Sequence, residues 1–314
     1  MHLYTAAVYT NKYLGEGYSR RAKLTDLERS YVDALPHLLE SYHYINSPAL
    51  LQKIRDDGKK VFLDSGAFSA WTTGVTIDLK DYCAYVQRND DLWLRTEDGD
   101  LMISVLDGIG DPLQTYRNQL SMEALGVTPL PCFHYGEDER YLDYYAANYN
   151  YITIGGMVGK SKKQLIDWLD MLWEDHMTDS SGRPKAKFHA FGITAREIMY
   201  RYPWYSVDSS SWIQAASFGF LLTPEFGIVQ VSEKSRNRHI QGQHLCNFSE
   251  VERQRIISTF TDAGFTEERL STCYESRVAY NLRAMVEINK LINASEVHQQ
   301  QKFHTHKNFL FGAN

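Results

Sequence analysis

The stretch that decides the fold is residues 128–154, TPLPCFHYGEDERYLDYYAANYNYITI. An apolar run at 128–134 is followed by an amphipathic segment at 138–148 and a second apolar run at 151–154. A strand, a helix and a second strand in this order predict a parallel βαβ unit. The residues that end the two runs, His134 and Gly155-Gly156, would then lie at one edge of the sheet.

The same alternation extends over most of the chain. Amphipathic segments, including 23–39 and 161–175, separate eight apolar runs that predict strands. Eight strands suit a closed (β/α)8 barrel of the TIM type, and an open doubly wound sheet is the alternative. The predicted strands are residues 3–9, 60–63, 101–106, 128–134, 151–154, 187–191, 204–207 and 227–231.

Two more helical patterns, at 249–263 and 276–292, follow the last predicted strand. They predict a small helical C-terminal appendage to the barrel. The expected domains are therefore a catalytic barrel at 1–235 and a helical region at 236–314, which would bind zinc or nucleic acid.

Composition sets the broad class. The 314 residues are 43% hydrophobic, enough for one large core, and no apolar run approaches the ~20 residues of a membrane helix. We expect a cytoplasmic protein (host cytoplasm for a phage protein), because the N-terminus lacks a secretory pattern. Four cysteines without a CxxC pair argue against a disulfide framework. A net charge of −6 argues against a strongly basic nucleic-acid binder, although residues 231–314 carry 11 Lys and Arg against 9 Asp and Glu.

Polar residues recur where the predicted strands end. In a barrel this is the edge that carries the active site. One such aspartate is explained as well by capping the next helix, and a glycine by making the turn. Three aspartates at equivalent positions favour a shared site. The strand-end residues are Asp64, Asp107, His134, Gly155, Gly156 and Asp208.

Five motifs around these residues resemble, in order, those of the tRNA-guanine transglycosylase superfamily. They are FLDSGAFSAW at 62–71, VLDGIGDP at 105–112, ITIGGMVG at 152–159, FHAFGIT at 188–194 and YSVDSSSW at 205–212. The chain departs from the tRNA enzymes, because DSGA replaces DSGG, SSSW follows Asp208, and the CxCxxC zinc motif is absent. The segment DSGAFSAW is more similar to the corresponding segment of the DpdA-type enzymes of phages and bacteria. The resemblance implies a pentosyltransferase that exchanges guanine in DNA for 7-cyano-7-deazaguanine.

The resemblance also implies roles for single residues. Asp208 would be the nucleophile and Asp64 the acid/base, so the chemistry needs no cofactor. Asp107 would accept the protons on the guanine edge, and His134 would donate to the base carbonyl. Backbone groups at Gly155, Gly156 and Met157 would contact the rest of the base, and Ser65 would be a further contact. Phe68 and Met157 would stack on the two faces of the base, although a role for both in the hydrophobic core is an equal alternative.

The phosphate and zinc expectations concern the later part of the chain. Arg196, Arg236 and Arg238 are candidates to hold DNA phosphates, or are solvated surface residues. Four residues could together bind a structural zinc, or they could be separate residues that share no site. They are His239, His244, Cys246 and Cys273. The competing functions are the same chemistry on tRNA, a non-catalytic accessory barrel that binds nucleic acid, and an unrelated barrel enzyme. Oligomeric state cannot be read from the sequence.

Overall fold

The computed structural model describes residues 1–193, 195–236 and 243–303. These residues form two compact units. Unit 1 contains residues 1–10, 37–209 and the described residues from Ile292 onward, and unit 2 contains residues 11–36 and 210–291. The predicted boundary between 235 and 236 therefore falls inside unit 2.

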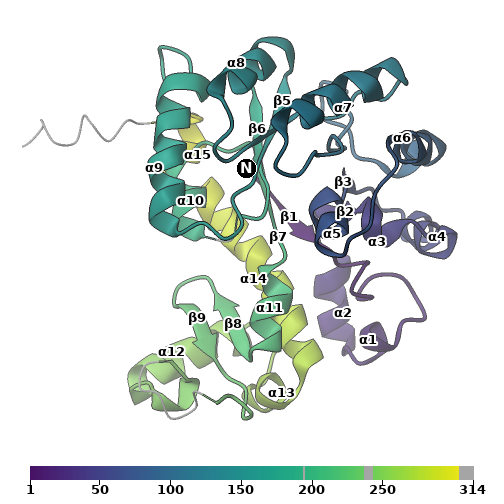
Figure 1. Ribbon diagram of the computed structural model, residues 1–314. Coiled ribbons are helices and arrows are strands. Elements are labelled where there is room, and N and C mark those ends of the chain that lie inside the picture. Colours follow the sequence, from purple (N-terminus) through teal and green to yellow (C-terminus); the bar gives the residue numbers. More distant parts are fainter. Residues whose placement is uncertain (194, 237–242, 304–314) are drawn as a thin grey trace, which may run out of the picture. The chain divides into compact units, whose positions relative to one another are not determined.

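Unit 1 is built on a curled parallel sheet of seven strands with helices around it (Figure 1). Neighbouring strands follow the order β3, β2, β1, β7, β6, β5, β4, and every pair is parallel. The strands are β1 (His2–Ala6), β2 (Leu38–Ser41), β3 (Phe62–Asp64), β4 (Cys132–His134), β5 (Tyr151–Gly155), β6 (Lys187–Ala190) and β7 (Ser206–Ser209). The helices of unit 1 include α4 (Pro48–Asp56), α5 (Ala67–Thr72), α6 (Leu79–Arg88), α7 (Pro112–Ala124), α8 (Glu139–Asn148), α9 (Lys162–Leu172), α10 (Arg196–Arg201) and α15 (Glu296–Gln300).

Residues 101–106, predicted as a strand, make isolated parallel bridges toward both edges of the sheet. Leu63 donates to the Met102 carbonyl (3.0 Å) and accepts from the Ser104 amide (2.9 Å). Two further backbone hydrogen bonds join the segment to Leu130, just before β4. The predicted α/β class with a curled parallel sheet is confirmed, whereas a complete eight-stranded barrel is not.

The helix predicted at 23–39 is wrong in its second half. Helix α2 (Asp26–Asp33) begins at Thr25, which forms a capping box with Glu28, and ends before Pro36. Residues 38–41 form β2 instead. Leu38, Leu39 and Glu40 are all buried, so this strand shows none of the apolar–polar alternation that identifies a half-exposed strand.

The segment predicted as a strand at 227–231 is a strand, but it does not belong to the parallel sheet. Strand β9 (Gly227–Gln230) pairs antiparallel with β8 (Phe220–Thr223) in unit 2 and takes no part in the parallel sheet. A short apolar run predicts a strand but does not say which partner it pairs with. The eight predicted strands therefore included residues 227–231, which are not in the parallel sheet, and omitted residues 38–41, which are.

Unit 2 is a mixed α/β unit rather than a purely helical appendage. Asn281 on α14 (Tyr274–Asn293) ties its parts together, because its side chain accepts from Leu222 N (2.8 Å) and donates to the Trp212 carbonyl (3.2 Å). The other elements of the unit are α1 (Ser19–Ala22), α11 (Ser211–Ser217), α12 (Glu250–Thr261) and α13 (Glu267–Thr272).

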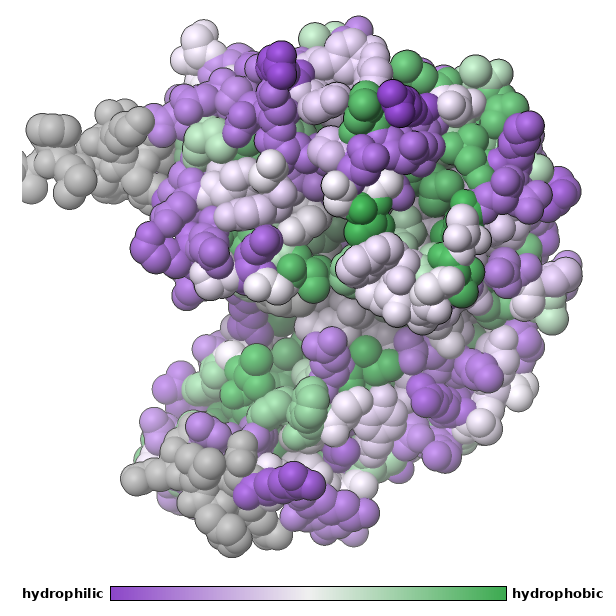
Figure 2. Space-filling model, viewed as in Figure 1, coloured by the Kyte–Doolittle hydropathy of each residue, from purple (hydrophilic) through white to green (hydrophobic). Residues whose placement is uncertain are grey.

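An apolar layer fills the interior of the sheet in unit 1. Tyr4, Phe62 and Tyr151 are buried in one cluster, and the rings of Tyr4 and Phe62 meet edge to face with 5.5 Å between their centroids. The outer surface is mixed, since hydrophilic and hydrophobic residues alternate over the face seen in Figure 2. Within the described ranges no helix is both long and apolar enough to cross a membrane.

Candidate functional site

The predicted site residues of unit 1 lie where its strands end. Asp64, His134 and Gly155 are the last residues of β3, β4 and β5. Asp208 is the third residue of β7, and Asp107 follows the segment at 101–106. The strands are parallel, so these ends share one edge of the sheet. The three aspartates converge, because the charges of Asp107 and Asp208 both act on Asp64.

Asp64 sits in surroundings that favour its neutral form. Loss of hydration raises the pKa of Asp64 to about 7, and the charges of Asp107 and Asp208 add to this. Its Oδ2 accepts from Gly66 N (3.0 Å), which opposes part of the shift. Gly66 has a φ of +74°, and a Cβ there would lie 2.6 Å from His43 Cβ, so only glycine fits this turn. Asp64 is therefore a carboxyl group that can gain or lose a proton near neutral pH.

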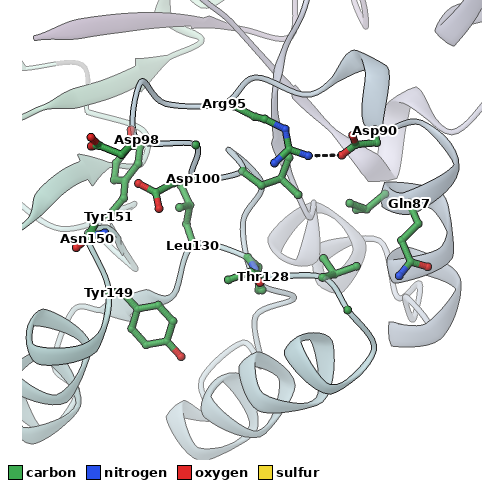
Figure 3. Close-up of a pocket in the computed structure, with 16 residues that line it drawn as sticks. Gln87, Asp90, Arg95, Asp98, Asp100, Thr128, Leu130, Tyr149, Asn150 and Tyr151 are labelled. Carbon is green, nitrogen blue, oxygen red and sulfur yellow. Dashed lines mark hydrogen bonds and ion pairs between the residues drawn. The ribbon is translucent and has the colours of Figure 1, made fainter.

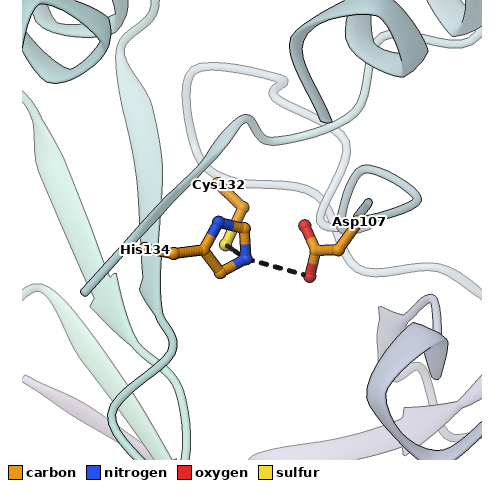
Figure 4. A group of neighbouring side chains, drawn as sticks. All are labelled: Asp107, Cys132 and His134. Carbon is orange, nitrogen blue, oxygen red and sulfur yellow. Dashed lines mark hydrogen bonds and ion pairs between the residues drawn. The ribbon is translucent and has the colours of Figure 1, made fainter. Parts of the chain in front are cut away.

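Asp107 lacks partners for one of its buried oxygens. Its Oδ2 lies 3.4 Å from His134 Nε2 (Figure 4), whereas its Oδ1 has no hydrogen-bond partner among the described residues. A buried carboxylate oxygen without a donor is costly, so such a group is typical of a site that a ligand completes.

His134 is held from both sides of its ring. Nδ1 lies 2.7 Å from Glu137 Oε1, and Nε2 lies 3.4 Å from Cys132 Sγ. Burial by itself lowers the pKa of His134. Cys132 and Asp107 raise this pKa by more than burial lowers it, so it lies above its usual value. Burial and the Asp107 charge raise the pKa of Cys132 to about 11, which leaves a neutral thiol. Because this thiol is neutral, we attribute the raised pKa of His134 to the charge of Asp107.

Asp208 is buried and held at one oxygen. Its Oδ1 accepts from Gly192 N (2.8 Å), and His189 Nε2 lies 3.3 Å away, although not in hydrogen-bond geometry. His189 on β6 is fully buried, and burial lowers its pKa although Asp208 opposes the shift. His189 was not among the residues predicted from the sequence, although a histidine within the apolar run 187–191 is a visible signal.

The remaining substrate residues differ in exposure. Phe68 on α5 is 52% exposed, whereas Met157 and Ser65 are buried, so Phe68 is the one that is open to a ligand. The Ser65 amide donates to Ser104 Oγ (2.7 Å), which fits a role in the turn. The Gly155 carbonyl already accepts from the Tyr135 amide (3.1 Å). At Gly156, with a φ of +71°, a Cβ would lie 2.9 Å from the same amide nitrogen.

Two cavities of similar size lie near this sheet. One of about 420 Å³ is lined by Asp107, together with Trp71 of α5 and Asn118 of α7. The other, of about 410 Å³, is lined by Leu101 and Tyr151, where strand residues begin rather than end (Figure 3). Catalytic residues of parallel barrels sit at the other edge, so we place the site at the cavity beside Asp107.

The described members of the predicted phosphate and zinc sets belong to both units. Arg196 begins α10 in unit 1, and Arg236 is exposed in unit 2. Arg238 and His239 lie outside the described residues. His244 contacts Cys246 Sγ (3.1 Å) and the Ser232 carbonyl (3.1 Å), while Cys273 contacts Glu275 (3.7 Å). These described members of the predicted zinc set do not form a three-ligand group.

A different group has the residue types of a metal site. Among the described residues, ligand atoms of Asp107, Cys132 and His134 lie within 4.8 Å of one another (Figure 4). Cys132 and His134 are two apart in β4 and so face the same side of the strand. That spacing could have identified the pair from the sequence.

No family model and no curated protein matches the chain. The resemblance to transglycosylases therefore depends on its five motifs, and the site has to be argued from its own geometry.

Proposed function

We propose that this chain is a transglycosylase that exchanges guanine in DNA for 7-cyano-7-deazaguanine through a covalent intermediate on Asp208. The observation that carries the proposal is Asp64, whose pKa of about 7 results from burial and from the charges of Asp107 and Asp208 at the same sheet edge. Base exchange needs a nucleophile and a proton-transfer group with different tasks, as in retaining glycoside hydrolysis. The proposal includes a complete eight-stranded barrel, with residues 101–106 as the strand between β3 and β4.

The reaction takes two displacements at C1′. In the first, an Asp208 oxygen bonds to C1′, the C1′–N9 bond to guanine breaks, and Asp64 gives its proton to the departing base. In the second, Asp64 takes the N9 proton of the incoming 7-deazaguanine, whose N9 bonds to C1′ while the Asp208–C1′ bond breaks. Two inversions return the base to its original face, and Asp64 and Asp208 end as they began.

Base recognition centres on Asp107. Its Oδ1, which has no hydrogen-bond partner among the described residues, and its Oδ2 can each accept one of the two protons that the N1–H and 2-amino group of a guanine-like base present, with the base in the cavity that Asp107 lines. Phe68 on α5 is exposed enough to stack on that base. A base in a duplex must be flipped out to reach this edge. Arg196, Arg236 and Arg238 stay predictions as DNA phosphate contacts.

Replacing Asp107 should weaken binding of the base more than it slows the sugar step. Asp107→Asn presents an amide N–H₂ to the donor edge of the base, and the resulting mismatch costs roughly 1–3 kcal/mol. We expect the Kd of free 7-cyano-7-deazaguanine to rise about 5- to 150-fold by calorimetry. Asp167→Asn on α9 is the matched control, since Asp167 is exposed and pairs with Lys163 at the surface. Unchanged affinity in Asp107→Asn would remove the assigned role.

The function itself is tested by incubating the purified chain with guanine-containing DNA and 7-cyano-7-deazaguanine, followed by mass spectrometry of the nucleosides. The modified deoxynucleoside should appear together with released guanine. A parallel reaction with tRNA decides between the two polymers. If neither polymer is modified while DNA still binds, the chain is the non-catalytic accessory protein.

The group in Figure 4 favours a second candidate, a zinc enzyme that uses Asp107, Cys132 and His134 as ligands. Tetrahedral zinc with bonds of about 2.3 Å to sulfur and 2.0 Å to nitrogen separates these atoms by about 3.5 Å. Cys132 Sγ and Asp107 Oδ2 each lie 3.4 Å from His134 Nε2. Glu137 on Nδ1 matches the carboxylate that commonly orients a ligating histidine.

Metal analysis separates the candidates, because Asp107 cannot be a free acceptor for the base while it binds zinc. A zinc enzyme should purify with about one zinc per chain and lose it in Cys132→Ser. The Cys83→Ser variant is the control, because Cys83 is buried on α6 and does not belong to the three-ligand group. Zinc below a tenth of an equivalent in the parent protein, even after zinc is supplied during expression, would end this alternative.

A further inference from the structure

A chain of buried polar side chains runs behind Asp208 in unit 1. Tyr151 Oη lies 2.5 Å from Ser206 Oγ, which lies 2.6 Å from His189 Nδ1. On the other side of the ring, His189 Nε2 lies 3.3 Å from Asp208 Oδ1. The four residues come from three adjacent strands, β5, β6 and β7. Ser206 and Asp208 are two apart on β7, so both face the side on which His189 lies.

Only one direction of proton donation suits all four of these side chains. An ionised Asp208 has no proton to give, so the His189 nitrogen that faces it must carry the N–H. A neutral ring then has an acceptor at Nδ1, which takes the Ser206 hydroxyl proton. Ser206 Oγ in turn accepts from Tyr151, which keeps its proton because burial raises its pKa well above the ordinary value. The reverse direction would set the lone pair of Nε2 against a carboxylate.

The surroundings strengthen this arrangement. The His189 ring packs against the rings of Phe62 and Phe191, with centroids 4.8 Å and 4.6 Å away. Such apolar walls keep water away, so an N–H directed at a carboxylate interacts more strongly than it would in solvent. Burial also lowers the pKa of His189, which keeps the ring neutral with a single N–H to place.

We propose that His189 is a positioning residue for Asp208. Its buried Nε2 has no hydrogen-bond partner among the described residues and faces Asp208 Oδ1 at 3.3 Å, so its N–H acts on that carboxylate as a nearby dipole, with the tautomer set by Ser206 and Tyr151. Oδ1 of Asp208 then accepts from the Gly192 amide and faces the His189 N–H, which leaves Oδ2 to attack C1′. The inference rests on the proposed function for the role of Asp208. The tautomer itself follows from the geometry and can be measured without any substrate.

The first test is ¹⁵N NMR of the histidine rings in the free protein. The chain has 11 histidines, so the His189 signals are assigned by their loss in His189→Gln. We expect a neutral ring with the proton on Nε2. In Ser206→Ala, which removes the donor to Nδ1 but leaves Asp208 in place, we expect Nε2–H to stay the major tautomer with a larger share of Nδ1–H than in the parent protein. A proton on Nδ1 in the parent protein, or a ring with both nitrogens protonated at pH 7, would overturn the inference whatever the activity.

The second test compares rates of sugar–protein adduct formation. His189→Gln keeps an N–H near the position of Nε2 and should stay within about tenfold of the parent rate. His189→Leu keeps the bulk without the donor and should lose on the order of 10²-fold, the usual effect of removing one preorganised donor. Equal rates in His189→Leu and the parent would contradict a positioning role. If the parent protein forms no adduct at all, the proposed function fails, and the NMR result still decides the tautomer.

Discussion

Asp208→Asn is expected to abolish base exchange, with a loss on the order of 10⁴-fold or more. An amide oxygen cannot form and then release the ester bond to C1′. The variant should fold, because asparagine has the same shape and can still accept the Gly192 amide at Oδ1. The measurement is denaturing electrophoresis of the enzyme with labelled DNA, in the presence and absence of the incoming base.

The parent enzyme should show an adduct that decreases when the incoming base is added, and Asp208→Asn should show none. Asp167→Asn, an exposed aspartate on α9, is the matched control and should behave like the parent. An adduct that persists in Asp208→Asn would place the nucleophile elsewhere, and Asp64 would be examined first.

Asp64→Asn should slow the reaction on the order of 10²–10⁴-fold, because the departing guanine loses its proton donor. The parent rate should fall as pH rises above about 7, where Asp64 becomes ionised and can no longer donate. Asp64→Asn should lose this pH dependence. A parent rate that stays constant between pH 6 and 9, with proton transfer limiting the reaction, would contradict the acid role.

The same variant should be more stable than the parent at high pH. The folded pKa of Asp64, about 7, lies above its ordinary value of 3.8, so the folded state binds the extra proton. This contribution to the free energy of unfolding is complete below about pH 4 and is lost as pH rises through 7. We therefore expect Asp64→Asn to exceed the parent by roughly 1–3 kcal/mol at pH 8, reduced for partial exposure, and to match it near pH 4. Denaturant unfolding at the two pH values measures this, with Asp167→Asn showing no such difference.

The sequence predicted the elements whose signal is local. The helices predicted at 138–148 and 161–175 are found as α8 (Glu139–Asn148) and α9 (Lys162–Leu172), because apolar periodicity is read within one segment. Strand-end positions also follow from local runs, which is why Asp64, Asp107 and His134 could be singled out. The sequence could not separate β2 from the helix before it, since a buried strand lacks the apolar–polar alternation that identifies a half-exposed strand.

The sequence by itself determined that parallel strands would carry aspartates at their carboxyl ends. Only the tertiary structure decided which strands are neighbours, and this placed β9 in a hairpin of unit 2 and β2 beside β1. It also decided what surrounds each side chain: the pKa of Asp64, the unpartnered oxygen of Asp107, and the line from Tyr151 through His189 to Asp208. These properties arise between residues far apart in the chain. Burial and distance act through space, and a pattern along the sequence does not contain them.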